Sequence, residues 1–450
     1  MSNLATKIAN QEAVVGIVGL GYVGLPLAVG FGRIGFSILG IDLSEDKVNA
    51  LNDGHSYIPD VPSDQIQSLQ KKERFIASTS YDDLTKADVI FICVPTPFDA
   101  QKAPDLSFIE SASSSIAKVL RSGQLIILQS TTYPGTTKEI VLPPLQSTGL
   151  QVGRDFYLAF SPERIDPGQV SSAGFDVVNT PKVVGGMTER CTQLAADFLA
   201  KLTPEVCPVS SPEVAEMCKL LENTFRSVNI ALVNELTLLS DRMGIDIWEV
   251  INAAKTKPFG FMPFEPGPGV GGHCIPVDPY YLSWKAREFD FYTKFIELAA
   301  EVNSDMPYFT VQKIGQALND QGISLKAAKI LILGVAFKRD IDDARNSPAE
   351  RVIELLLKAG ADVCFHDPFV DQFSVGNNVF LREKSSIPSV DLTENTMENV
   401  DCAVIITNHS GQDYEWVAQH CKLLFDTRNA TQALQRRFKN IIRLGAPAPV

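Results

Sequence analysis

The chain contains 450 residues, of which 45% are hydrophobic and 21% are charged, and its formal net charge is −13. This negative balance excludes nucleic acid as a bulk partner, because phosphate backbones are bound by basic surfaces. A single hydrophobic core rarely serves so long a chain, so we expect two or three domains.

No segment has the features of a targeting or membrane-spanning element. The first residues carry no long apolar run behind positive charges, and nowhere do about 18 apolar residues follow one another without interruption. The eight cysteines form no CxxC pair, which argues against a disulfide framework and a structural zinc site. We therefore expect a cytoplasmic protein with no membrane partner and no metal site.

The first strong motif lies in residues 13–42. A β-branched apolar run is followed by Gly19, Gly21 and Gly24, then by a helical pattern, and then by a second strand that ends in Asp42. This order of strand, glycine turn, helix, strand and acid is typical of dinucleotide binding, in which the helix N-terminus faces the pyrophosphate. Because an acid at Asp42 would bind ribose hydroxyls and repel a phosphate, the motif predicts NAD rather than NADP.

Further strands are expected within residues 87–97 and 123–137. Each apolar run ends in small or hydroxyl residues, among them Thr96, Ser130 and Thr131. In a doubly wound sheet, ligands lie at the carboxyl ends of the strands, so these side chains are expected beside the cofactor. The alternative is that threonine and proline simply end the strands.

From Pro212 the sequence has helical periodicity for some thirty residues. Lys219, Asn223 and Arg226 are spaced so that all three project from one face of this helix. Apolar neighbours favour the wall of a polar pocket, and a solvated stripe remains the alternative. A helix of this length also suits a domain connector and a dimerisation surface.

The strand–helix–strand pattern returns after residue 326, with the strands "KILILGVAF", "ADVCFHDP" and "DCAVIITNH". Of the glycine motif only Gly334 remains, and Lys338 follows it, so Lys338 and Arg345 are expected to meet an anion. The predicted fold is α/β, with two Rossmann-like doubly wound domains joined by a long central helix. The expected domains are 1–208 (NAD-binding), 209–315 (central and helical) and 316–450 (Rossmann-like, for a nucleotide-bearing substrate, which the family resemblance given below implies to be a UDP-sugar).

A single thiol, Cys274, lies in the glycine- and proline-rich stretch "PGPGVGGHCIPVDP". In an NAD enzyme a thiolate can attack a product aldehyde, and loss of a second hydride then gives a thioester that water hydrolyses. Such a cysteine predicts oxidation as far as a carboxylate. Lys219 and Asn223 suit the oxyanion, and Asp278 is a candidate for proton handling.

Glu163 in "FSPERIDPG" is a second candidate for proton handling. His273 is a weaker general base, because adjacent residues in an extended loop point apart. A metal site at His273 and Cys274 is weaker still, since partners at ligand spacing are absent from the sequence.

Seven motifs together resemble one family, the UDP-glucose/GDP-mannose dehydrogenases. They occur in the family's order from about residue 13 to residue 430, and they are "GLGYVGLPLA", "CVPTP", "STTYPGTT", "SPERIDPG", "CKLLENTFRSVNIALVNE", "PGPGVGGHCIPVDP" and "GVAFKRDIDDARNSP". The resemblance implies oxidation of a nucleotide sugar at C6 by two NAD⁺ and one water. It also implies a homodimer or higher homo-oligomer.

The resemblance carries roles to individual positions. It implies Cys274 as the nucleophile, Lys219 as its oxyanion partner, and Thr131 and Glu163 as the residues that hold or activate water, with Asn223 and Asp278 completing the catalytic set. Cofactor contacts are expected at Gly19, Gly21, Tyr22, Val23, Gly24, Asp42, Lys47, Pro95, Thr96, Thr131 and Arg345. Substrate contacts are expected at Glu163, Arg164, Lys219, Asn223, Arg226, Phe264, Gly267, Gly271 and Lys338.

Within the family, the chain looks most similar to the UDP-N-acetylglucosamine 6-dehydrogenases, which serve surface polysaccharide synthesis. The proline- and glycine-containing loop that begins with "KPFGF" carries Phe259, Phe261 and Phe264, which would pack against an acetamido methyl. UDP-N-acetylgalactosamine, UDP-N-acetylmannosamine and UDP-glucose remain alternative substrates. A two-electron hydroxyacid dehydrogenase and a non-catalytic nucleotide-sugar binding protein are the alternatives of another class.

Overall fold

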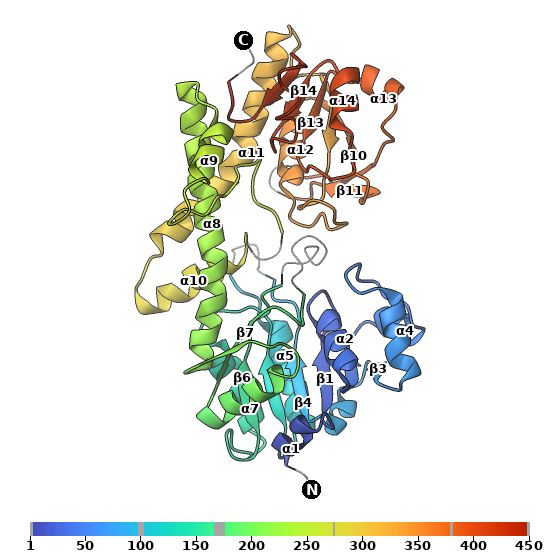
Figure 1. Ribbon diagram of the computed structural model, residues 1–450, viewed down its shortest axis with the longest axis vertical. Coiled ribbons are helices and arrows are strands. Elements are labelled where there is room, and N and C mark those ends of the chain that lie inside the picture. Colours follow the sequence, from blue (N-terminus) through green and yellow to red (C-terminus); the bar gives the residue numbers. More distant parts are fainter. Residues whose placement is uncertain (1–2, 98–102, 166–175, 273–274, 379–380, 448–450) are drawn as a thin grey trace. The chain divides into compact units, whose positions relative to one another are not determined.

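The computed structural model describes residues 3–97, 103–165, 176–272, 275–378 and 381–447 (Figure 1). Its backbone forms two compact units. Unit 1 comprises Met1–Glu222 with Tyr280–Tyr292, and unit 2 comprises Asn223–Pro279 with Thr293–Val450. The boundary falls inside the long helix α8 (Pro212–Met243), so that one helix contributes to both units.

Unit 1 is built on an eight-stranded sheet in the order β3-β2-β1-β4-β5-β6-β7-β8. Neighbouring strands are parallel except β6 and β7. The central strands are continuous apolar runs, such as "VIFI" in β4 and "LIIL" in β5, and all eight of these side chains are buried. Such runs are typical of parallel strands that helices cover on both faces. The strands are β1 (Val14–Val18), β2 (Ser37–Ile41), β3 (Phe75–Ser78), β4 (Val89–Ile92), β5 (Leu125–Leu128), β6 (Tyr157–Phe160), β7 (Lys182–Gly186) and β8 (Val206–Val209).

The helices of unit 1 begin at residues that suit a helix N-terminus. The Ser44 side chain accepts a hydrogen bond from the backbone of α3, and the Thr188 side chain does the same for α7. The helices are α1 (Leu4–Ala9), α2 (Gly24–Ile34), α3 (Glu45–Asn52), α4 (Ser63–Lys71), α5 (Ser107–Val119), α6 (Leu142–Gln146), α7 (Glu189–Leu199) and α10 (Asp278–Ala286), with the short turns η1 (Tyr81–Lys86), η2 (Thr137–Val141) and η3 (Arg287–Phe289).

Unit 2 contains a five-stranded parallel sheet in the order β10-β9-β13-β14-β15 and a two-stranded antiparallel pair, β11 and β12. Its strands are β9 (Lys329–Leu333), β10 (Asp362–His366), β11 (Gln372–Val375), β12 (Ser385–Pro388), β13 (Cys402–Ile405), β14 (Leu424–Asp426) and β15 (Ile441–Arg443). Its helices are α9 (Ile247–Ala254), α11 (Lys294–Asp320), α12 (Pro348–Lys358), α13 (Glu394–Glu398) and α14 (Tyr414–His420).

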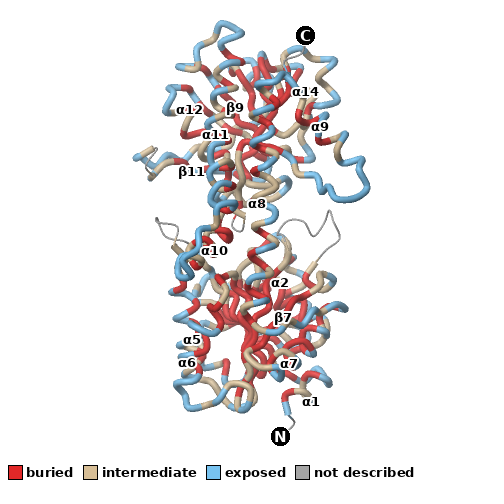
Figure 2. The backbone as a smooth tube through the Cα atoms, turned by 90° about the vertical axis from the view of Figure 1, so that its left-hand side faces the viewer, coloured by how far each residue is buried: buried red, intermediate tan, exposed pale blue. Residues whose placement is uncertain are grey.

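Each unit has its own hydrophobic core (Figure 2). In unit 1 the rings of Phe31 and Phe198 stack with centroids 4.6 Å apart, and Phe36 and Phe91 pack around them. In unit 2 the strands β9, β10 and β13 are buried against α11 and α12. The predicted α/β class, with two sheets that are largely or wholly parallel and a long central helix, is confirmed.

The strands predicted from the glycine motif and from its later echo are all present. The helix predicted from Pro212 runs for 32 residues. In the part of the chain that the structure describes, no helix is both long enough and apolar enough to cross a membrane. The division into 1–208, 209–315 and 316–450 stays a prediction.

Candidate active site

The glycine turn after β1 is shaped by steric necessity. Gly19 has a φ of +92°, and a Cβ atom there would lie 2.5 Å from the Cys93 carbonyl oxygen. A Cβ atom at Gly24 would lie 1.8 Å from the Gly19 oxygen. At Gly21, by contrast, no atom of the described residues lies within 4 Å of a built Cβ. The turn is therefore tight on its protein side and open where a pyrophosphate would approach α2.

Asp42 directly follows β2 and is hydrogen-bonded to the glycine turn. Its Oδ2 atom accepts a hydrogen bond from the Leu20 backbone N–H at 3.0 Å, and its Oδ1 atom accepts one from Ser44 at 3.0 Å. Lys47 Nζ lies 3.4 Å from Oδ2. The Tyr57 hydroxyl donates to the Leu20 carbonyl at 2.7 Å, a contact that the sequence did not indicate. The acid predicted to bind ribose is thus held at the carboxyl edge of the sheet.

The next strand ends complete this edge of unit 1. Pro95 and Thr96 follow β4, and the Thr96 carbonyl accepts a hydrogen bond from the Tyr281 hydroxyl. Thr131 follows β5 and is half-buried. Tyr22 and Val23 lie in the turn before α2. Within unit 1 the structure therefore brings together the predicted cofactor residues of the first, second, fourth and fifth strands. Such a cradle fits NAD, which when bound accepts a hydride.

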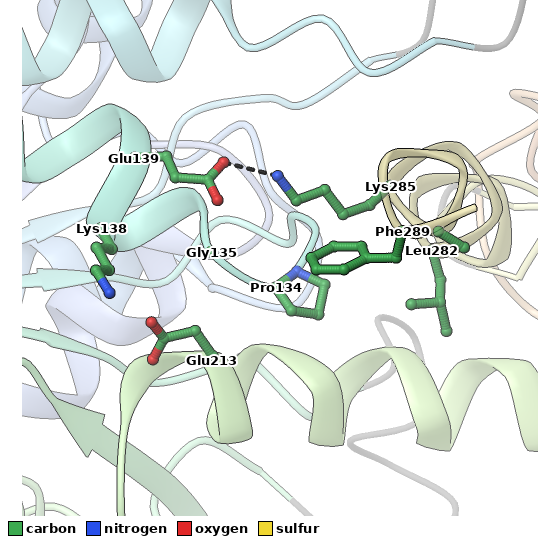
Figure 3. A pocket seen from close by; sticks show the side chains of 9 residues that line it. Pro134, Gly135, Lys138, Glu139, Glu213, Leu282, Lys285 and Phe289 are labelled. Carbon is green, nitrogen blue, oxygen red and sulfur yellow. Dashed lines mark hydrogen bonds and ion pairs between the residues drawn. The ribbon is translucent and has the colours of Figure 1, made fainter. Parts of the chain in front are cut away.

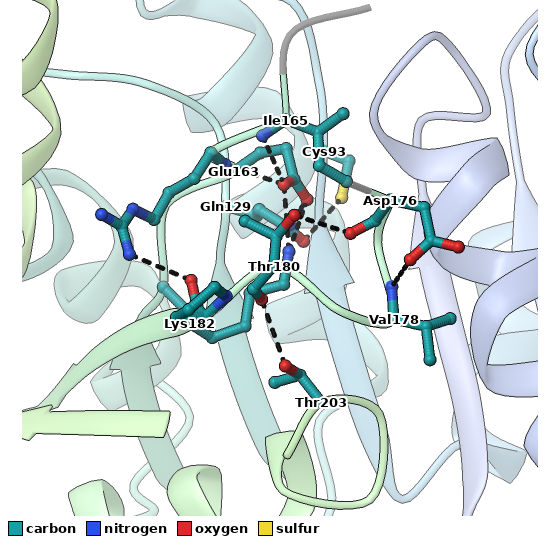
Figure 4. A network of polar contacts seen from close by, with 12 residues as sticks. Cys93, Gln129, Glu163, Ile165, Asp176, Val178, Thr180, Lys182 and Thr203 are labelled. Carbon is teal, nitrogen blue, oxygen red and sulfur yellow. Dashed lines mark hydrogen bonds and ion pairs between the residues drawn. The ribbon is translucent and has the colours of Figure 1, made fainter. Parts of the chain in front are cut away.

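Glu163, three residues beyond β6, lies in a dense polar network (Figure 4). Its carboxylate accepts hydrogen bonds from Lys182 Nζ at 2.9 and 3.0 Å and from Gln129 Nε2 at 2.7 Å. The backbone N–H groups of Arg164 and Ile165 donate to Oε1 at 2.7 and 3.0 Å. Burial alone would raise the pKa of Glu163, but the charge and hydrogen bonds of Lys182 and the two backbone donors outweigh it, so its pKa lies below the usual value.

Arg164, a predicted substrate contact, already has partners in the structure. Its Nη2 atom lies 2.7 Å from Glu222 Oε1, and its Nη1 atom donates to the Pro181 carbonyl at 3.0 Å. About 30% of its side chain is exposed. A substrate anion would therefore compete with Glu222 for this guanidinium.

The helix α8 carries the next group. Lys219 and Asn223 lie one turn apart, and only 7% and 4% of their surfaces are exposed. Asn223 Nδ2 donates to Asp278 Oδ2 at 2.5 Å, and Asp278 is the first residue of α10. Arg226 is exposed. Two predicted catalytic residues, Asn223 and Asp278, are therefore joined directly, although 55 positions separate them.

A buried carboxylate fixes the first turns of α8 within unit 1. Glu216 accepts hydrogen bonds from the Gly135 and Thr137 backbone N–H groups at 2.6 and 2.9 Å, and from the Thr137 hydroxyl at 2.7 Å. The loop that carries Thr131 is thereby bound to the turn of helix just before Lys219. Burial raises the pKa of Glu216 despite these donors. Sequence reasoning missed this residue.

A pocket of about 480 Å³ adjoins the same loop in unit 1 (Figure 3). Lys285 crosses it to bind Glu139 at 2.8 Å, and Pro134, Glu213 and Phe289 also line it. None of the predicted site residues lines this pocket. It is therefore separate from the candidate active site.

In unit 2 the loop after β9 repeats the construction of the first unit. Gly334 has a φ of +80°, and Asp367 at the end of β10 accepts hydrogen bonds from the Val335 and Ala336 N–H groups at 2.7 and 3.0 Å. His409 Nε2 lies 3.1 Å from the same carboxylate, a partner that the sequence did not indicate. Lys338 lies in this loop.

Arg345 lies in the segment between β9 and α12. It forms a two-pronged pair with Asp343, at 2.9 and 2.7 Å. Because Arg345 belongs to unit 2, its predicted contact with the cofactor bound by unit 1 stays a prediction.

The glycine-rich segment before α10 packs inside unit 2. The Gly267 N–H donates to Asn234 Oδ1 at 3.1 Å, and a Cβ atom at Gly271 would lie 2.8 Å from Phe337 Cβ. Phe264 packs edge-on to Phe225, with ring centroids 5.8 Å apart. The Phe337 side chain therefore lies so close to the backbone at Gly271 that a larger residue would not fit there. Cys274 and His273 lie outside the described residues, so their predicted roles stay predictions.

Arg428 is a cation that sequence reasoning missed. It follows β14, and a Cβ atom at Gly267 would lie 2.3 Å from its Nη1 atom. Among the described residues, no hydrogen bond or ion pair of its guanidinium is found. Burial lowers the pKa of Arg428, and Glu265 and Asp426 oppose this effect. The signal in the sequence was an arginine two residues after the fourth strand of the second sheet.

Together these residues define a class of protein: an oxidoreductase with one NAD-binding sheet and a second Rossmann-like sheet that carries cationic side chains. Three models of the UDP-glucose/GDP-mannose dehydrogenase family match the chain. They are the NAD binding domain over residues 13–203, the central domain over 213–305 and the UDP binding domain over 331–433. The chain belongs to the UDP-glucose/GDP-mannose dehydrogenase family.

Individual relatives differ in the sugar that they are named for. A UDP-N-acetyl-D-glucosamine 6-dehydrogenase of Pseudomonas aeruginosa is 38% identical over 80% of this chain and 84% of its own. The solved UDP-D-ManNAc dehydrogenase of Pyrococcus horikoshii has a TM-score of 0.86 at 31% identity, over 97% of this chain and 100% of its own. An NDP-N-acetyl-D-galactosaminuronic acid dehydrogenase of Methanosarcina mazei has a TM-score of 0.79 at 29% identity, over 100% and 98%. The comparisons therefore establish the family but not the hexosamine.

Proposed function

We propose that the protein oxidises C6 of UDP-N-acetyl-D-glucosamine to the uronic acid, with two NAD⁺ and one water consumed, as a supply of precursors for surface polysaccharide. The observation that carries this proposal is the group of buried polar residues on α8 and at the start of α10. Lys219 and Asn223 are buried one turn apart, and Asn223 is bonded to Asp278, only four residues beyond Cys274.

The roles follow from the chemistry of the residues. The Cys274 thiolate adds to the C6 aldehyde, Lys219 and Asn223 stabilise the oxyanion, and Thr131 and Glu163 serve the hydrolytic water. Asp278 orients Asn223 through their hydrogen bond. Arg164, Arg226, Phe264, Gly267, Gly271 and Lys338 bind the substrate, and Arg428 adds a cation for its diphosphate.

The choice of sugar rests on the 38% identical Pseudomonas aeruginosa relative and on the "KPFGF" stretch. UDP-N-acetylmannosamine is the second candidate, because the Pyrococcus horikoshii structure is named for it. UDP-N-acetylgalactosamine and UDP-glucose are the remaining alternatives.

The test is the yield of NADH per molecule of limiting UDP-N-acetylglucosamine, measured for the wild type, for Cys274→Ser and for Cys207→Ser. Cys207 is an exposed cysteine and provides the matched control. We expect two NADH per sugar from the wild type and Cys207→Ser, and no completed turnover from Cys274→Ser.

Other yields would correct specific parts of the proposal. One NADH per sugar, unchanged by Cys274→Ser, would contradict the four-electron mechanism. No NADH from this sugar, with two from UDP-N-acetylmannosamine or another nucleotide sugar of the panel, would correct the substrate alone.

A further inference from the structure

The Glu163 carboxylate is saturated with hydrogen-bond donors. Five hydrogen bonds from four groups reach its two oxygen atoms, which offer about four lone-pair sites. Only 9% of the surface of Glu163 is exposed. A carboxylate held in this way cannot rotate, and its charge stays at a fixed position beside the carboxyl ends of β5 and β6.

Lys182 provides the only full positive charge among these four donors. It is the first residue of β7, which pairs antiparallel with β6, so its side chain enters the network from beneath Glu163 in Figure 4. It is 0% exposed, and Nζ lies within 3.0 Å of both carboxylate oxygens. A lysine is rarely buried so completely unless it is paired.

The neutral donor, Gln129, is itself held in a set orientation. The Cys93 thiol donates to Gln129 Oε1 at 3.6 Å, which leaves the Gln129 amide group free to donate to Glu163. Burial, with the Glu163 charge nearby, raises the pKa of Cys93, so this thiol stays protonated and can act as a donor. All side-chain contacts of Glu163 that the structure describes therefore favour the ionised form.

We propose that Lys182 is a positioning residue for the hydrolytic half of the reaction, because it keeps the Glu163 carboxylate ionised and fixed. This inference rests on the function proposed above. In the hydrolytic step the water oxygen bonds to the thioester carbon, the carbon–sulfur bond breaks, the Cys274 thiolate leaves and the protons pass to solvent. Because its lone pairs already accept hydrogen bonds from the protein, Glu163 acts on this water through the electrostatic field of its fixed, permanent negative charge.

The pH dependence separates this role from simple structural support. In the wild type, the pKa of Glu163 is depressed, so the carboxylate is ionised throughout the neutral range. Protonation of Glu163 therefore does not slow hydrolysis as the pH falls to 6. In Lys182→Met the buried carboxylate loses its cation, so its pKa rises and it becomes protonated as the pH falls. Below the raised pKa, hydrolysis should slow about tenfold per pH unit.

The experiment is rapid-mixing measurement of NADH release at pH 6 and pH 9. We expect Lys182→Met to show at pH 6 a burst of two NADH per active site and then a steady rate at least about tenfold below wild type, because the thioester accumulates. At pH 9 the steady rate should recover. Lys182→Arg keeps the charge and should show neither the burst nor the acid limb.

The matched control is Lys285→Met. Lys285 is also buried, at 6% exposed, and is paired with Glu139 and Glu288 outside the candidate site. It should show neither the burst nor the new pH dependence. If Lys182→Met does not fold, the double variant Glu163→Gln with Lys182→Met removes both buried charges together. That variant should fold and show a burst at both pH values.

A second readout is independent of turnover. Infrared difference spectra against Glu163→Gln should show an ionised Glu163 at pH 6 in the wild type and a protonated one in Lys182→Met. A Lys182→Met variant with an ionised Glu163, or with no burst at pH 6, would overturn the inference. Failure of the proposed function would look different, since the wild type itself would then release one NADH or none per sugar.

Discussion

At the scale of single residues, Arg428 is the side chain whose environment most favours a bound anion. It is partly buried, its guanidinium has no hydrogen-bond partner among the described residues, and it follows β14 at the carboxyl edge of its sheet. Ligands of doubly wound sheets lie at this edge. The guanidinium is thus left with donors that a diphosphate would satisfy in the proposed enzyme.

We therefore expect Arg428→Met to raise the KM for the UDP-sugar about 10- to 100-fold, the equivalent of one or two charged hydrogen bonds. The KM for NAD should stay within about twofold. The control is Arg437→Met, a surface arginine paired with Glu415. Initial-rate kinetics with each substrate varied in turn will measure both constants, and an unchanged KM for the sugar would contradict the assignment.

The site could be predicted only in part from the sequence. The glycine turn, Asp42 and the α8 residues were predictable because spacing along one element fixes their positions. Lys182 and Arg428 were not, because their roles depend on pairing between strands far apart in the chain. For Lys182 the signal was a lysine at the head of the apolar strand "KVVGG", where a charge needs a buried partner.

At the scale of elements, α8 exposes a stripe of large apolar side chains along much of its length. Each of these residues has between 41% and 61% of its surface exposed, and they are Val214, Met217, Leu221, Phe225, Leu232, Leu236, Leu239 and Met243. Most of these residues are three or four positions apart, the spacing by which a helix packs against another helix. We propose that a second copy of the chain covers this stripe.

The substitution pair Leu232→Arg with Leu239→Arg should place two charges in that interface and separate the copies. Sedimentation velocity should show twice the chain mass for the wild type and one chain mass for the double variant. Ile76→Arg is the control, because Ile76 is 59% exposed but lies on the edge strand β3. A wild type that sediments as one chain, or a double variant that still sediments as two, would contradict the proposal.

The elements themselves were predictable where the apolar pattern is strong. β1, β4, β5, β9 and β13 are continuous apolar runs, and α8 begins at the proline that predicted it. The strand β8 was not predicted, because its residues are half-buried or exposed and include Cys207 and Pro208. Its place in the sheet depends on pairing with β7 rather than on its own composition.

At the scale of the whole molecule, the two sheets are two variants of one design. In each, an acid at the end of the second strand accepts hydrogen bonds from the loop after the first strand: Asp42 from Leu20, and Asp367 from Val335 and Ala336. In unit 1 that acid lies beside the open glycine turn. In unit 2 the buried His409 lies 3.1 Å from Oδ2, the same oxygen atom that accepts from Val335 and Ala336, and the Phe369 backbone N–H donates to Oδ1, so both oxygen atoms of Asp367 already have partners inside the protein. The second sheet therefore suits a nucleotide held by cations rather than by a ribose-binding acid.

This difference predicts separate footprints for the two ligands in hydrogen exchange measured by mass spectrometry. NAD should slow exchange mainly in residues 14–47, and UDP mainly in residues 330–347 and around Arg428. With each ligand at about 100 times its Kd, protection of the globally exchanging amides should rise by about 2.7 kcal/mol. Asp42→Asn should reduce the NAD footprint and leave the UDP footprint unchanged, and Arg428→Met should do the reverse. Protection of residues 14–47 by UDP alone would contradict the assignment of one ligand to each sheet, while added protection at Arg345 by NAD would support its predicted cofactor contact.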